Sequence, residues 1–204
     1  MKKLFDYINE ALIKKDTKIS TWNYFPKDKE ELKSLLKQLL EERGEDANLN
    51  DIDTSKIIDM SELFYRLDPH NIDISEWNVS NVEDMKYMFH GCKKFNCDLS
   101  QWNVSKVTNM KNMFYFCTKF NSNLSEWDVS KVTDMYSMFD ECKKFNCDLS
   151  QWNVSKVEDM DYMFFECEKF NSDLSGWNVK NVAYMDGMLR GCTSLKNKPS
   201  WYKE

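Results

Sequence analysis

The sequence predicts an α/β repeat solenoid, in which short parallel strands and short helical segments form stacked coils below an N-terminal helix. Two observations carry this prediction. A unit of 25 residues recurs five times almost without a gap, and within each unit an extended segment alternates with an apolar pattern of helical spacing. A fixed period of this size is typical of supersecondary units stacked on copies of themselves.

Each unit carries a tryptophan, two methionines and a cysteine at fixed positions. We number the coils by their tryptophans, from coil 1 to coil 5, which are Trp77, Trp102, Trp127, Trp152 and Trp177. The methionine pairs are Met85/Met88, Met110/Met113, Met135/Met138, Met160/Met163 and Met185/Met188, and the cysteines are Cys92, Cys117, Cys142, Cys167 and Cys192. Apolar residues that recur in every coil are expected to form its core rather than a site.

The N-terminal part of the chain precedes the repeats. Residues 1–25 are expected to form an amphipathic helix and a connector. Residues 26–48 are expected to hold a capping helix, because Asp28 with Glu31 fits a capping box and Gly44 is a typical helix stop. A repeat array has to cover its first coil, whose outer side is apolar.

Residues 49–204 are expected to form the array itself. It begins with a degenerate first coil, continues through the five regular coils, and ends in a C-terminal tail whose Trp201 is expected to close the last coil. Within a unit, F-N-x-D-L-S-x-W favours an extended segment. The following V-x-x-M-x-x-M-F-x-x-C places apolar residues three or four positions apart, which favours a short helix.

The motif in residues 95–114, FNCDLSQWNVSKVTNMKNMF, resembles the Met-rich form of the BspA-like leucine-rich repeat family. The similarity covers about residues 26–195. It implies a leucine-rich-repeat-like right-handed coil. It also implies a surface or adhesion-type protein without catalytic residues, although the N-terminus lacks the apolar stretch of a secretory signal.

The first residues, MKKLFDYINEAL, resemble the short capsid-targeting leader of internal head proteins in some tailed phages. This similarity would place a cleavage site after Ile8-Asn9-Glu10. It implies a phage or mobile-element protein that is packaged or delivered through its N-terminal helix and acts on a host protein. An ordinary amphipathic helix is the alternative interpretation.

Composition argues against several classes of function. The net charge is −6, from 28 basic and 34 acidic residues, whereas nucleic-acid binders usually carry a basic surface. No run of residues is long and apolar enough to span a membrane. The cysteines recur with the repeat, and Cys97 and Cys147 lie two coils apart, so buried free thiols are expected.

No nucleophile–base constellation, phosphate-binding loop or metal-binding motif is recognisable, so neither an enzyme nor a cofactor is expected. An acidic row recurs near the start of each unit, interrupted by Asn123, and it consists of Asp73, Asp98, Asp148 and Asp173. One carboxylate per coil does not match a calcium site. These residues are expected to be solvated or to cap turns, and no metal site is predicted.

Function is therefore expected at positions that vary between coils. The predicted partner-binding residues are aromatic or basic: Tyr87, Tyr115, Phe116, Tyr136, Tyr162, Phe165, Lys106, Lys131 and Lys156. Aromatic residues outside a core favour protein interfaces, whereas the alternative for the lysines is a solvated edge.

The sequence favours a non-catalytic protein-binding scaffold, expected to be a monomer that binds neither nucleic acid nor membrane. A phage-delivered modulator of a host protein and a bacterial surface adhesin are the alternatives. The expected location is the cytoplasm or a virion, with the cell surface as the alternative implied by the family resemblance.

Overall fold

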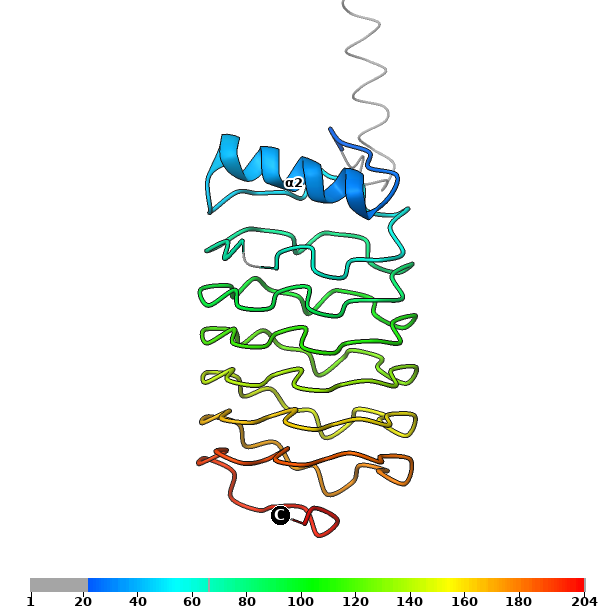
Figure 1. Ribbon diagram of the computed structural model, residues 1–204, viewed down its shortest axis with the longest axis vertical. Helices are drawn as coiled ribbons and strands as arrows, with labels where there is room; N and C mark the ends of the chain where they lie inside the picture. The colour runs from blue at the N-terminus through cyan, green and yellow to red at the C-terminus, as the bar shows by residue number, and fades with distance from the viewer. Residues whose placement is uncertain (1–21, 66, 204) are drawn as a thin grey trace, which may run out of the picture.

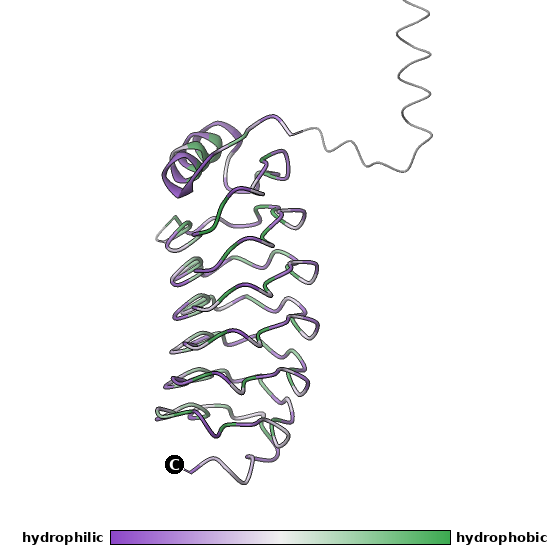
Figure 2. Cartoon of the chain, turned by 90° about the vertical axis from the view of Figure 1, so that its right-hand side faces the viewer, coloured by the Kyte–Doolittle hydropathy of each residue, from purple (hydrophilic) through white to green (hydrophobic). Residues whose placement is uncertain are grey.

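The computed structural model describes residues 22–65 and 67–203, which form one helix and a stack of similar coils (Figure 1). The helix lies across one end of the stack and the C-terminal residues lie at the other. Figure 2 shows hydrophobic and hydrophilic stretches alternating around every coil. The helix predicted near the start of the chain, with its leader-like motif, lies outside the described residues.

Helix α2 spans Lys29–Arg43, within residues 26–48, where the sequence predicts a helix. The side chain of Asp28 accepts a hydrogen bond from the backbone N–H of Glu31 at 3.0 Å. The carboxylate of Glu31 accepts one from the N–H of Lys27, one residue earlier than a capping box requires. Gly44 ends the helix with a φ of 82°. Three leucines of α2, Leu32, Leu36 and Leu39, are buried in the core that continues through the coils.

The predicted α/β class is wrong. Within residues 22–65 and 67–203, α2 is the only helix, and no strand or sheet is present. Neighbouring coils are joined by isolated parallel bridges, such as Asp84 with Asn109 and Asn109 with Asp134. Each coil is therefore a series of turns joined by short irregular segments, and neither the expected strands nor the expected helical segments form.

Backbone conformation explains why the Met-x-x-Met-Phe segments are not helical. Two residues per coil have a left-handed backbone, for example Tyr87 with a φ of 57° and Gly91 with a φ of 78°. Such residues interrupt a right-handed helix. The segment instead consists of consecutive turns, in which the N–H of Met88 bonds to Met85 O at 3.2 Å and that of Cys92 to Phe89 O at 2.9 Å. These turns reproduce the three-residue apolar spacing of a helix.

Alternate N–H groups of the same segments bond to the next coil. Tyr87 N–H donates to Lys111 O at 2.9 Å, and Phe89 N–H donates to Met113 O at 2.9 Å. Equivalent bonds recur between later coils, for example from Phe114 N–H to Met138 O at 2.9 Å. This ladder holds every coil in register with the coil that follows it.

The core is a set of side-chain ladders and confirms the predicted inward positions. Phenylalanine rings of successive coils stack, with centroids 5.4 Å apart for Phe89 and Phe114 and 5.6 Å apart for Phe114 and Phe139. Each tryptophan also donates its indole N–H to the preceding coil, as Trp127 does to Leu99 O at 3.0 Å. Buried polar groups are thus paired as well as packed.

The cysteines contribute to the same core. All seven are free thiols, of which six are buried and Cys97 is half-buried, as predicted. The thiol of Cys142 donates to Phe114 O at 3.0 Å, and the other four repeat cysteines make the same contact with the preceding coil. Burial raises the pKa of Cys142 well above its ordinary value, so the reactive thiolate is disfavoured.

The C-terminal tail covers part of the last coil. Trp201 stacks on Trp177, with ring centroids 6.5 Å apart, and donates its indole N–H to Leu174 O at 3.1 Å. It therefore continues the tryptophan ladder by one step. Val182 and Met185 of coil 5 remain half-buried, whereas their counterparts in coils 1 to 4 are buried.

Candidate partner-binding face

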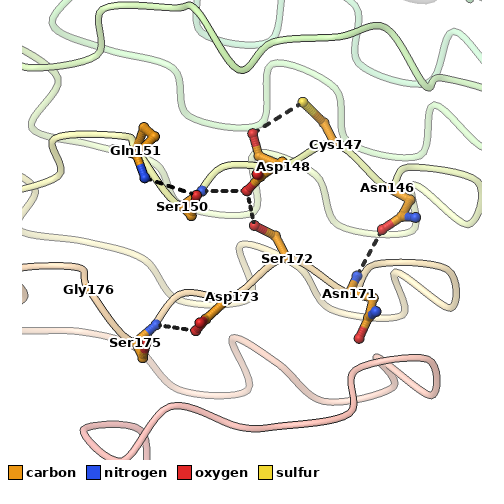
Figure 3. A pocket seen from close by; sticks show the side chains of 10 residues that line it. All are labelled: Asn146, Cys147, Asp148, Ser150, Gln151, Asn171, Ser172, Asp173, Ser175 and Gly176. Carbon is orange, nitrogen blue, oxygen red and sulfur yellow. Dashed lines mark hydrogen bonds between the residues drawn. The ribbon is translucent and has the colours of Figure 1, made fainter.

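One side of the stack is built from the Asp-x-Ser turns and contains an open hollow of about 600 Å³ (Figure 3). Its side chains bond mainly to one another. The side chain of Asp148 accepts hydrogen bonds from the N–H of Ser150 at 3.0 Å and from the hydroxyl of Ser172 at 3.1 Å. The side chain of Asn146 accepts from the N–H of Asn171 at 3.0 Å. These side chains connect neighbouring coils.

The aspartates of this side cap turns, as predicted. The N–H of Ser150 holds the pKa of Asp148 below its usual value, and Ser175 acts in the same way on Asp173. Within the part of the chain that the structure describes, no three His, Cys, Asp or Glu side chains are grouped so that they could hold a metal ion. All four aspartates of the row accept a backbone N–H of their own turn.

Serine and cysteine alternate at one position of these turns. The hydroxyl oxygens of Ser122 and Ser172 each accept a backbone N–H of the preceding coil at 2.8 Å. In the coil between them, the sulfur of Cys147 accepts the N–H of Leu124 at 3.1 Å. The two cysteines outside the core ladder, Cys97 and Cys147, therefore occupy a serine position of the turn.

Replacing Cys147 by Ser is expected to change the free energy of unfolding by less than about 1 kcal/mol, because serine makes this contact in adjacent coils. Cys147→Ala leaves the buried N–H of Leu124 without its acceptor and is expected to cost about 2 kcal/mol. Urea unfolding of both variants measures the difference. Equal losses would contradict an acceptor role for this side chain.

A second surface consists of the outward side chains of the segments that run from the residue before the first methionine to the residue after the cysteine of each coil, for example from Asp84 to Lys93 in coil 1. We call it the Met-segment face. All six predicted aromatic residues belong to these segments, and three of them, Tyr87, Phe116 and Tyr162, have a left-handed backbone. Its outermost rings are Tyr162, which is 37% exposed, and Tyr184, which is 61% exposed.

The first aromatic cluster on this face lies in the degenerate coil and in coils 1 and 2. The imidazole of His90 stacks on Tyr115, with ring centroids 4.6 Å apart, and contacts Tyr87 at 5.6 Å and Tyr65 at 5.0 Å. Phe116 joins Tyr115 at 6.1 Å. Three predicted residues, Tyr87, Tyr115 and Phe116, are thus brought together.

The second cluster lies in coils 3 and 4 and contains the remaining predicted rings. Tyr162 meets Tyr136 edge-on at 6.2 Å and Phe165 edge-on at 5.8 Å. Cations lie over these rings, with Lys111 Nζ 4.5 Å from the centroid of Tyr136 and the Arg190 guanidinium 5.7 Å from that of Phe165. These cation–π contacts pair surface charges with the rings of the second cluster.

The three predicted lysines are not part of either cluster. Lys106, Lys131 and Lys156 are exposed and stand in the Val-Ser-Lys-Val segment that precedes the Met-segment. The amine of Lys106 donates to the side chain of Asn81 in coil 1 at 2.7 Å. The structure thus divides the predicted residues into an aromatic group on the Met-segment face and a separate row of lysines.

Sequence reasoning missed Tyr65, His90 and Asp140. All three stand at the position that Tyr115 and Phe165 occupy in their own coils, so comparing that position across coils would have revealed them. Tyr65 also shows that the degenerate coil contributes to the face.

Asp140 is a buried carboxyl group in coil 3, between the equivalent positions of Tyr115 in coil 2 and Phe165 in coil 4. Its side chain is 8% exposed and accepts a hydrogen bond from the hydroxyl of Ser137 at 3.1 Å. Burial, followed by the nearby carboxylates of Glu141 and Glu166, raises the pKa of Asp140 to about 6. Burial and the charge of Asp140 also raise the pKa of Tyr115. A single residue thus places a titratable group in the middle of the face.

Comparisons with known proteins identify one family. Residues 31–134 and 122–203 match the family described as "Mycoplasma protein of unknown function, DUF285". No curated protein and no solved structure matches the chain. None of the helices in the described residues is both long and apolar enough to cross a membrane.

Proposed function

Because the chain belongs to the DUF285 family, whose description names no activity, we propose its function from its surface: a non-catalytic scaffold that binds a partner protein through the Met-segment face. One observation carries the proposal. The aromatic residues that break the repeat collect into two neighbouring clusters on this face, instead of being scattered around the coils.

The chemistry of these clusters suits protein recognition. Tyrosine and arginine are enriched among residues that dominate binding energy, because they combine a large contact area with polar ends. Hydrogen bonds between coils hold the backbone that carries the rings, so no backbone segment has to be ordered when a partner binds. The repeat motif is similar in sequence to BspA-like leucine-rich repeats, and we propose that this similarity extends to a binding role. This supports a scaffold that catalyses no reaction.

A triple variant tests the proposal without disturbing the coils. Tyr87→Asn and Tyr162→Asn introduce the residue that Asn112 supplies at the same position of coil 2, where its φ is 54°. Tyr115→Ala removes the ring that stacks on His90. Partners crosslinked to the wild-type protein in its native source would be identified by mass spectrometry, and the affinity of each purified partner would then be measured.

We expect the triple variant to bind its partner at least tenfold more weakly, as loss of interface anchors typically does. The matched control is Gln101→Ala/Glu126→Ala/Gln151→Ala, which changes exposed residues on the Asp-x-Ser side. A second variant, Lys106→Ala/Lys131→Ala/Lys156→Ala, tests the lysine row. A partner that loses affinity only with the control or the lysine variant would exclude the Met-segment face.

A further inference from the structure

Charge is distributed unevenly along the Met-segment face. Coil 1 presents Lys86 and Lys93, whereas coil 4 presents Asp161 and Glu168 at the two equivalent positions. Lys86 has a weak intrachain partner, Asp84, at 3.6 Å, and Lys93 lies 5.2 Å from the ring of Phe116. Coils 1 and 2, the N-terminal half of the four regular coils compared, carry Lys86, Lys93 and Lys111 against Asp84 and are therefore basic and aromatic.

The C-terminal half is acidic and aromatic. Coils 3 and 4 contribute Asp134, Asp140, Glu141, Asp159, Asp161, Glu166 and Glu168. Lys143 lies 3.4 Å from both Glu141 and Glu168, which offsets only part of this charge. Burial raises the pKa of Asp161, and the charges of Asp159 and Asp186 raise it further, so this carboxylate has more acidic neighbours than basic ones.

A two-fold axis that lies in the plane of the face, parallel to the coils, would reverse the coil order between two copies. Coil 1 of one copy would then face coil 4 of the other, and coil 2 would face coil 3. Because such an axis keeps equivalent positions opposite each other, Lys86 would meet Asp161, and Lys93 would meet Glu168. The first aromatic cluster would pack against the second, and every contact would occur twice.

Other arrangements of two copies match less well. A two-fold axis parallel to the stack would place coil 4 against coil 4 and thus acid against acid, which is unfavourable. End-to-end stacking would place the polar outer side of α2 against the C-terminal end, because α2 lies across the other end of the array (Figure 1).

We propose that the Met-segment face binds a second copy of this chain in reversed coil order, so that the basic first half of each copy lies on the acidic second half of the other. This inference rests on the proposed function, since it names a partner for the same face. It replaces the monomer expected from the net charge and the covered ends with a dimer whose specificity is electrostatic.

Exchanging charges between the two halves tests the proposal. One variant carries Lys86→Asp and Lys93→Glu, and the other carries Asp161→Lys and Glu168→Lys. Each new residue already stands at the same position of another coil, so the fold tolerates it. Sedimentation velocity at low salt would measure the mass of the wild type, of each variant and of their equimolar mixture, and circular dichroism would check that each variant is folded.

The wild type is expected to sediment as a dimer, each variant alone as a monomer, and the mixture as a dimer, because only the mixed pair places opposite charges together. Raising the salt concentration is expected to weaken the dimer, since exposed charges are screened. The control Lys106→Glu/Lys156→Glu lowers the net charge by as much as Lys86→Asp/Lys93→Glu does, but outside the face. This control is expected to remain dimeric.

A monomeric wild type, or a mixture that stays monomeric while both variants are folded, would overturn the dimer. Dimers formed by each variant alone would do the same. The proposed scaffold function would survive these results if the tyrosine variant still lost its partner. Conversely, a dimer with no heterologous partner would confine the function of the face to self-association.

Discussion

Replacing Phe139 by Ala is expected to lower the free energy of unfolding by about 4 kcal/mol, the cost typical of removing a large side chain from a packed core. Phe139 is completely buried in the middle of the stack. Its ring lies 5.6 Å from both Phe114 and Phe164 and 4.1 Å from Phe145. The cavity would therefore interrupt the ring ladder between coils, and urea unfolding followed by tryptophan fluorescence would measure the loss.

The matched control is Phe139→Leu, because Leu189 occupies the same position in coil 5. Leucine keeps most of the volume and is expected to cost only about 1.5 kcal/mol. If the two variants lost the same stability, the contribution of the ring ladder would be smaller than its geometry suggests.

Replacing Asp140 by Asn is expected to stabilise the protein by about 2–3 kcal/mol at pH 7. Burial raises the pKa of Asp140 from its ordinary value of 3.8 to about 6, so ionisation is easier in the unfolded chain than in the folded one. The stability contributed by the protonated carboxyl is present below the unfolded pKa and is lost as the pH rises through the folded pKa. Asparagine retains the acceptor for Ser137 without becoming charged.

The difference between Asp140→Asn and the wild type is therefore expected to be small below about pH 4 and to increase up to about pH 6. Above that pH the difference is expected to be constant. Asp148→Asn is the control. Its carboxylate is stabilised by Ser150, and its counterpart in coil 3 is already Asn123, so a small loss is expected. Unfolding curves at several pH values would measure the difference. If the free energy of unfolding of Asp140→Asn differed from that of the wild type by the same amount at every pH, burial would not affect this carboxyl.

The repeat itself is sufficient to predict the core. Residues such as Trp127, Met135 and Cys142 recur with the same period in every coil. Apolar side chains that recur in this way are buried between stacked coils. Local chemistry is equally informative at α2, where Asp28 and Gly44 mark the two ends of the helix. The core and the helix ends can both be predicted because they depend on patterns that are visible in the sequence itself.

The conformation of the Met-x-x-Met-Phe segments could not be read in this way. Consecutive turns place Met85, Met88 and Phe89 on one side, as a helical turn would, so side-chain spacing does not distinguish the two. The difference lies in the left-handed backbone at positions such as Tyr87, Phe116 and Glu141, none of which is a residue typical of that conformation. Bonding to the next coil compensates for this cost, and that bonding is visible only in the assembled stack.

The candidate face was predicted in part for a related reason. The aromatic residues stood out because they break the repeat, and the structure shows which of them touch. The lysines were grouped with them because their position also varies between coils, with Lys106, Lys131 and Lys156 in three coils and asparagine in the first and last, although they belong to another segment of the coil. Sequence period gives the order of positions around a coil but not the side to which each one points.

The three side-chain ladders also restrict how the length of such a chain can change. Trp127 bonds to Leu99 and Cys142 bonds to Phe114, so both span 28 residues, while the Asn146 N–H reaches 25 residues back to Asn121. Inserting or deleting one residue within a coil would misalign all three ladders together, whereas adding a whole coil would disturb none of them. The identity of residues 93–107 and 143–157 fits growth in complete coils, which lengthens the binding surface while keeping the spacing of all three ladders.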